Sequence, residues 1–232
     1  MRKYVSTFWP LYWIAAVIVV TVSLTASRAV TVLAENSPIS REIVFIIDAG
    51  HGGEDGGATS CTGVLESQIN LEIALRLNDL MHLLGLDTVM IRTTDISVYT
   101  QGSTIAAKKV SDLKQRVRIV NETENAFLIS IHQNIFSDSR YYGAQVFYNS
   151  QSREVAEQLQ TSLVSALNPG SRRKSKSASG VYLMQNIHRP GLLVECGFLS
   201  NPEEEALLRA GEYQKKLCCV IAASVSKNHY AT

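Results

Sequence analysis

Short strand-like runs recur along this chain, separated by stretches with helical periodicity. The runs 43–47, 126–131 and 191–194 contain almost only apolar residues, which is typical of strands covered on both faces. After the first run, an apolar stripe at helical spacing extends from Ile69 to Leu84. Strands that alternate with helices in this way predict an α/β fold with a mostly parallel sheet.

Charge, composition and cysteine spacing exclude several classes of protein and of site. The 232 residues include 22 Lys and Arg against 21 Asp and Glu, a formal net charge of +1, which is too balanced for a nucleic-acid binder. With 46% apolar residues, the chain is not intrinsically disordered. Its four cysteines are too few and too poorly spaced for a disulfide framework, and no C-x-x-C motif predicts a thiolate zinc site.

The N-terminal segment predicts export. Arg2 and Lys3 precede an uncharged stretch from Tyr4 to Ser27, which is long enough to cross a bilayer with its N-terminus in the cytoplasm. An uncleaved signal anchor fits this length, and a signal peptide cleaved after Val32-Leu33-Ala34 is the alternative. The predicted parts are an anchor or signal peptide in residues 1–34, a linker in residues 35–41 and an exported domain in residues 42–232.

Four residues able to bind metal or transfer protons are expected to lie around one crevice. His51, His132 and Glu195 follow three of the apolar runs, and Glu66 opens the first predicted helix across a glycine-rich loop from His51. Ligand sites of α/β sheets gather beyond the carboxyl ends of the strands. Two imidazoles, one carboxylate and an open position form a recurrent catalytic zinc site, and a second carboxylate would serve as general base.

Each of these residues also has a structural interpretation. In the structural interpretation, Glu66 is an acid that the helix dipole favours at an N-terminus, and His132 is a buried structural histidine. Glu195 is more informative, because a carboxylate within an apolar strand is rare unless it is paired or functional. Cys196 is expected on the opposite face as a buried, inert thiol, and Asp55 as a solvated loop acid.

Two predicted loops have unusual properties, one in its length and the other in its charge. Residues 93–110 are predicted as a polar loop that is longer than most connections, with Ser111 capping the helix that follows. Residues 172–176 form a basic, serine-rich loop. We interpret it as a solvated loop, and binding of an anionic glycan or lipid is the alternative.

Five segments together resemble the zinc-dependent N-acetylmuramoyl-L-alanine amidases among the cell-wall hydrolases. They are residues 47–53 (IDAGHGG), 65–70 (LESQIN), 112–116 (DLKQR), 130–134 (SIHQN) and 194–201 (VECGFLSN). The resemblance implies Zn²⁺ held by His51, Glu66 and His132, with Glu195 as general base and then acid. It also implies a mixed, mostly parallel sheet of about six strands sandwiched by helices.

The apolar N-terminal segment and residues 143–148 (GAQVFY) make the chain most similar to membrane-associated spore-cortex amidases. This implies removal of stem peptides from peptidoglycan glycan strands, so that a partner muramic-acid deacetylase acts and muramic-δ-lactam forms for germination. The implied location is the intermembrane space of the developing spore, with the N-terminal helix in the membrane. The need for an accessory protein stays open. Ile135-Phe136 departs from the small or polar residues of the family and would narrow the substrate groove.

Two other functions fit the same residues. A zinc carboxypeptidase acting on the stem peptide would use the same metal chemistry. A catalytically silent, membrane-tethered wall-binding module would need no metal.

Overall fold

The computed structural model describes residues 43–229, so the predicted anchor and linker lie outside the described residues. Within this range, no helix combines the length and the apolar character that crossing a bilayer requires.

A six-stranded mixed sheet forms the centre of the domain, in the order β2-β1-β3-β6-β4-β5. The strands are β1 (Val44–Ala49), β2 (Thr88–Met90), β3 (Ala126–Asn134), β4 (Gln145–Tyr148), β5 (Lys176–Ser177) and β6 (Gly191–Phe198). All neighbouring strands run parallel except β4 and β6, which are antiparallel. The predicted mixed, mostly parallel sheet of about six strands is therefore confirmed.

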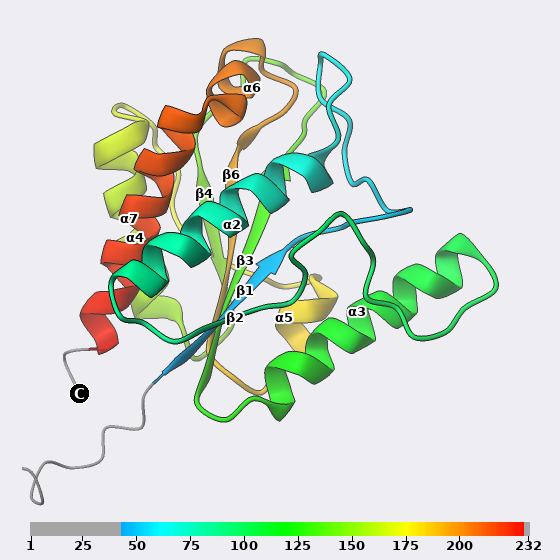
Figure 1. Cartoon of the computed structure of the whole chain (residues 1–232). Coiled ribbons are helices and arrows are strands. Elements are labelled where there is room, and N and C mark those ends of the chain that lie inside the picture. The colour runs from blue at the N-terminus through cyan, green and yellow to red at the C-terminus, as the bar shows by residue number, and fades with distance from the viewer. Residues whose placement is uncertain (1–42, 230–232) are drawn as a thin grey trace, which may run out of the picture. The chain divides into compact units, whose positions relative to one another are not determined.

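Helices cover both faces of this sheet (Figure 1). They are α2 (Glu66–Leu83), α3 (Ile105–Glu122), α4 (Arg153–Leu167), α5 (Tyr182–Asn186), α6 (Pro202–Arg209) and α7 (Gly211–His229). The adjacent helices α2, α7 and α4 lie on one face, and α3 lies with α5 on the other. The predicted sandwich is confirmed.

Strand β1 shows how the sequence divides the core in two. Phe45 and Ile47 pack with α2, α4 and α7, whereas Ile46 packs with α3 and α5. This follows from the alternation of side chains along a strand. All three side chains are buried, and each contributes about 1.5–3 kcal/mol of hydrophobic free energy.

Helix α3 begins earlier than predicted. It starts at Ile105 and is capped by Thr104, whose hydroxyl accepts a hydrogen bond from the Ala107 N–H at 3.2 Å. Ser111 lies inside the helix, and its hydroxyl accepts hydrogen bonds from the backbone N–H groups of Thr100 and Gln101. The first turns of α3 are largely exposed and lack an apolar stripe, so periodicity did not reveal them.

Candidate active site

The four predicted residues converge at the carboxyl ends of the three central strands β1, β3 and β6. His51 lies two residues beyond β1, and Glu66 is the first residue of α2. His132 and Glu195 lie within β3 and β6, which are longer than expected, and they are register partners in the parallel ladder. The structure therefore brings these four residues close together.

Three of these side chains form a cluster with the chemistry of a metal site. One donor atom from each of His51, Glu66 and His132 lies within 4.8 Å of the other two. The Nε2 atom of His51 is 3.3 Å from Oε2 of Glu66, and Nδ1 of His132 is 3.1 Å from Oε1. Two imidazole nitrogens and a carboxylate oxygen match the protein ligands of catalytic zinc sites, so these residues fit Zn²⁺.

Two glycines allow this close approach. A Cβ atom at Gly50 would lie 2.3 Å from Nε2 of His132, far inside van der Waals contact. Gly57 has a φ of +68°, and a Cβ atom there would lie 2.6 Å from Oε2 of Glu66. The glycine-rich loop therefore leaves room for the imidazole and carboxylate groups that surround it.

His51 itself has an unusual backbone conformation, with a φ of 62°. Two buried arginines hold the loop that carries it. Arg116 donates hydrogen bonds to the carbonyls of Ala49 and His51, and Arg92 donates to those of Ala49 and Gly50. Such over-determined surroundings maintain a strained residue at a functional site.

These arginines extend the predicted site. Arg116 belongs to one of the segments that carry the family resemblance, but Arg92 was not recognised. Its signal in the sequence was a guanidinium directly after an otherwise apolar strand. Buried charges in such positions are uncommon unless they are paired or hydrogen-bonded.

Glu66 is held as a buried carboxylate. Its oxygens accept hydrogen bonds from the backbone N–H groups of Ala58 and Gln133 and from the side-chain amide of Asn70. Burial alone would raise the pKa of Glu66, but hydrogen bonds with His132 and His51 lower it well below its usual range. Its position along the chain favoured an acid that only stabilises a helix N-terminus. The contacts of Glu66 with two imidazoles show that it does more than this.

Asp55 is bound to the other side of the His51 ring. Its Oδ2 atom is 2.9 Å from Nδ1 of His51, and Nζ of Lys109 lies 3.1 Å from the same carboxylate. A carboxylate on the second imidazole nitrogen fixes the orientation of a metal-binding histidine. The expectation of a solvated loop acid is wrong, because Lys109 and the His51 ring both bind Asp55.

Glu195 has the properties of a general base. Its Oε2 atom is buried and has no hydrogen-bond partner among the residues that the structure describes. Burial, together with the nearby Glu66 carboxylate, raises the pKa of Glu195 to about 7, although His132 and His51 act in the opposite direction. A carboxylate with a pKa near neutral is suited to accept and return a proton.

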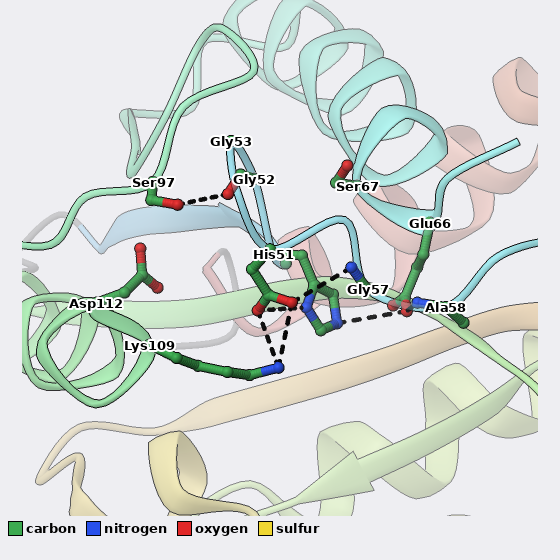
Figure 2. A network of polar contacts seen from close by, with 12 residues as sticks. His51, Gly52, Gly53, Gly57, Ala58, Glu66, Ser67, Ser97, Lys109 and Asp112 are labelled. Atoms are coloured by element: carbon green, nitrogen blue, oxygen red, sulfur yellow. Dashed lines mark hydrogen bonds and ion pairs between the residues drawn. The ribbon is translucent and has the colours of Figure 1, made fainter. Parts of the chain in front are cut away.

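The loop 93–104 closes one side of the site. The Ser97 hydroxyl donates to the carbonyl of Gly52 (Figure 2), and the Gly53 N–H donates to Asp95 at 3.0 Å. The loop therefore packs on the glycine-rich loop that carries His51. Cys196 is fully buried on the α2 side of the sheet, as predicted, and His82 bonds to Thr88 away from the site.

Comparisons with known proteins show which family this chain resembles along most of the described domain. The profile of the N-acetylmuramoyl-L-alanine amidase family matches residues 45–227. The germination-specific N-acetylmuramoyl-L-alanine amidase of Bacillus subtilis (strain 168) is 39% identical over 194 residues, covering 82% of this chain and 79% of its own.

Solved structures show the same similarity. The CwlD amidase of Clostridioides difficile, solved in complex with the GerS lipoprotein, is 34% identical with a TM-score of 0.78, and the match covers 82% of this chain and 100% of that one. An N-acetylmuramoyl-L-alanine amidase from Clostridium difficile 630 is 28% identical with a TM-score of 0.70, covering 82% and 98% of the two chains.

Proposed function

The chain belongs to the N-acetylmuramoyl-L-alanine amidase family, and on that premise we propose that it cleaves the muramic acid–L-alanine amide bond of peptidoglycan with Zn²⁺ bound by His51, Glu66 and His132. Glu195 is the proposed general base and acid. The observation that carries this proposal is the convergence of the three donor atoms within 4.8 Å, close to the buried Glu195 oxygen that has no hydrogen-bond partner within residues 43–229.

Bound Zn²⁺ would polarise the amide carbonyl and lower the pKa of water. The protein's own residues have separate tasks. Glu195 accepts a proton from the attacking water and delivers it to the amine of the leaving L-alanine. Asp55 orients the His51 ring, while Arg92 and Arg116 hold the loop backbone on which this ring depends. The glycine-rich loop leaves the centre open to a bulky glycan strand.

Muropeptide analysis tests this activity directly. Purified peptidoglycan is digested with the full-length protein, with and without a chelator, and the products are identified by mass spectrometry. We expect glycan without peptide together with intact stem peptides, and no products after chelation. Shortened stem peptides would instead identify a carboxypeptidase, and family membership favours the amidase over that alternative and over a silent wall-binding module.

We further propose that this amidase acts in the spore cortex. The similarity to a germination-specific amidase supports this role. The peptides would be removed outside the cytoplasm by a protein anchored through residues 1–34, so that a deacetylase can prepare muramic acid for lactam formation. The C. difficile relative forms a complex with a lipoprotein, which supports an accessory partner here as well. Expression in a spore-former lacking its own germination-specific amidase should restore muramic-δ-lactam, and an unchanged cortex would contradict this role.

A further inference from the structure

A basic groove lies beside the proposed catalytic centre. This cavity of about 790 Å³ is lined by residues 138 and 140–142, Gln145, residues 170–174 and Lys176. Its lining has one carboxylate, Asp138, which is paired with Arg140 at 2.7 Å. The cationic side chains are Arg140, Arg172, Arg173, Lys174 and Lys176. The groove therefore presents an excess of positive charge around a space large enough for a peptide segment.

Strand pairing places one end of this groove next to Glu195. Gln145 of β4 is the register partner of Glu195 in the antiparallel ladder with β6. Directly opposed residues of such a ladder project from the same face of the sheet. The Gln145 side chain in turn binds Arg173, whose Nη1 atom lies 3.0 Å from Oε1. One strand thus separates the proposed general base from the first cation of the groove.

Arg173 is held in place by neutral groups. Its Nε atom donates to the carbonyl of Tyr142 at 2.7 Å, and its guanidinium lies 4.4 Å from the centroid of the Phe198 ring. The nearby carboxylate of Glu204 accepts instead from the backbone N–H groups of Gly143 and Phe198, each at 2.8 Å. Arg173 is therefore preorganised by these contacts. Among the described residues, Arg172, Arg173, Lys174 and Lys176 form no ion pair.

We propose that the basic groove binds the carboxylates of the stem peptide, on the leaving-group side of the scissile bond. This inference rests on the proposed amidase function. The stem peptide carries free carboxylates at its C-terminus and on its acidic residue, and guanidinium groups bind carboxylates through paired hydrogen bonds. The glycine-rich loop and loop 93–104 lie on the β1 side of the centre, whereas the groove lies on the β4 side. The glycan strand and the peptide are accordingly bound on opposite sides of the metal site.

The test compares two substrates with two variants of the full chain. The substrates are a soluble muropeptide with free carboxylates and the same muropeptide with its carboxylates amidated. The variants are Arg173→Gln and the double variant Arg172→Gln with Lys174→Gln. The double variant leaves the structural contacts of Arg173 in place, since Arg172 and Lys174 are exposed. Lys216→Gln on α7 is the matched control, because it removes an exposed positive charge outside the groove.

For the wild type we expect amidation to raise KM about tenfold while kcat changes little, because binding energy shared by substrate and transition state is lost. Both variants should raise KM for the free muropeptide, and amidation should then raise KM less than it does for the wild type, because fewer cations remain to bind the carboxylates. Lys216→Gln should behave as the wild type.

Equal KM values for the two substrates with the wild type would contradict carboxylate binding in the groove, while the proposed amidase activity would still stand. The same holds if amidation affects the variants as strongly as the wild type. A wild type that cleaves neither substrate would instead overturn the amidase, and the groove assignment with it. Retained activity combined with weaker binding of anionic vesicles by the variants would assign the groove to lipid rather than to peptide.

Discussion

Glu195 and His132 are neighbours across one ladder, but they have different tasks. A glutamine at position 195 keeps the shape of the side chain and removes its basicity, so Glu195→Gln should bind zinc and lose about 10²–10⁴-fold in kcat. His132→Ala removes a ligand and should lose both metal and activity. Metal analysis of the purified protein together with muropeptide turnover separates the two effects. Full activity of Glu195→Gln would remove the proposed base.

Asp55 offers a second comparison among single residues. Asp55→Ala removes the group that orients His51, so zinc affinity should fall about 10–100-fold. Lys109→Gln should have a smaller effect in the same direction, because Lys109 contacts Asp55 and not the ring. Its neighbour Lys108 pairs with Glu54 at 2.6 Å, and Lys108→Gln is the matched control with unchanged affinity. Competition with a zinc-binding dye measures all three, and equal affinities for Asp55→Ala and the wild type would contradict the orienting role.

Residue types and order along the chain predicted much of the site. His51, His132 and Glu195 were identifiable because each follows or interrupts an apolar run. The pairing of Asp55 with Lys109 was not, since it joins residues 54 positions apart through a helix whose start was misplaced. Glu66 shows the same limit, because its position along the chain favours a helix terminus and only the family resemblance implied a metal ligand.

Strand β1 and helix α3 are joined by a buried ion pair. Asp48 binds Arg116 and accepts a hydrogen bond from the Ser130 hydroxyl at 2.6 Å. Burial would raise the pKa of Asp48, but Arg116 and Ser130 lower it below its ordinary value of 3.8. Because the folded-state pKa is depressed, the unfolded chain binds more protons in this range. The stabilisation is therefore complete above pH 3.8 and is lost as the pH falls through the lower, folded-state value.

Asp48→Asn should consequently lower the free energy of unfolding by about 3 kcal/mol at neutral pH, since it leaves Arg116 buried with one carboxylate fewer. Its stability should also depend less on pH in the acid range than that of the wild type. Urea unfolding at several pH values measures both effects. Glu122→Gln breaks the exposed pair with Arg118 and should change stability by less than about 0.5 kcal/mol. Parallel acid profiles for Asp48→Asn and the wild type would contradict this account.

Among the elements, the buried strands were the easiest to predict. Strands β1 and β3 are nearly continuous apolar runs, and short runs of this kind are typical of strands that are covered on both faces. Helix α6 has a start signal of its own, because the Asn201 side chain before Pro202 accepts hydrogen bonds from the N–H groups of Glu203 and Glu204. The two-residue strand β5 was missed, because its exposed Lys176-Ser177 pair has no apolar pattern and is a strand only through its pairing with β4.

At the scale of the molecule, the proposed metal connects segments that the chain order separates. The three ligands come from the loop after β1, the start of α2 and the strand β3. An ion that binds only the folded state stabilises it, by about 2.7 kcal/mol at a hundredfold excess over Kd. Removing zinc from the full-length protein should therefore lower Tm by about 5–10 °C.

Calorimetry with and without a chelator, followed by zinc addition, measures this shift. His132→Ala is the control, because without one ligand its Tm should not respond to the chelator. A wild-type Tm that is identical with and without metal would contradict a zinc site in the folded domain.

The reversal of direction at β4 has a consequence for how such an enzyme could diversify. The ligand-bearing segments all precede residue 134, whereas the cations beside Gln145 come from connections around the single antiparallel strand pair. Insertions or exchanges in those later connections would leave the three proposed metal ligands in place. Related enzymes can thus come to prefer cell walls of different composition through changes in these connections, while the metal site stays the same.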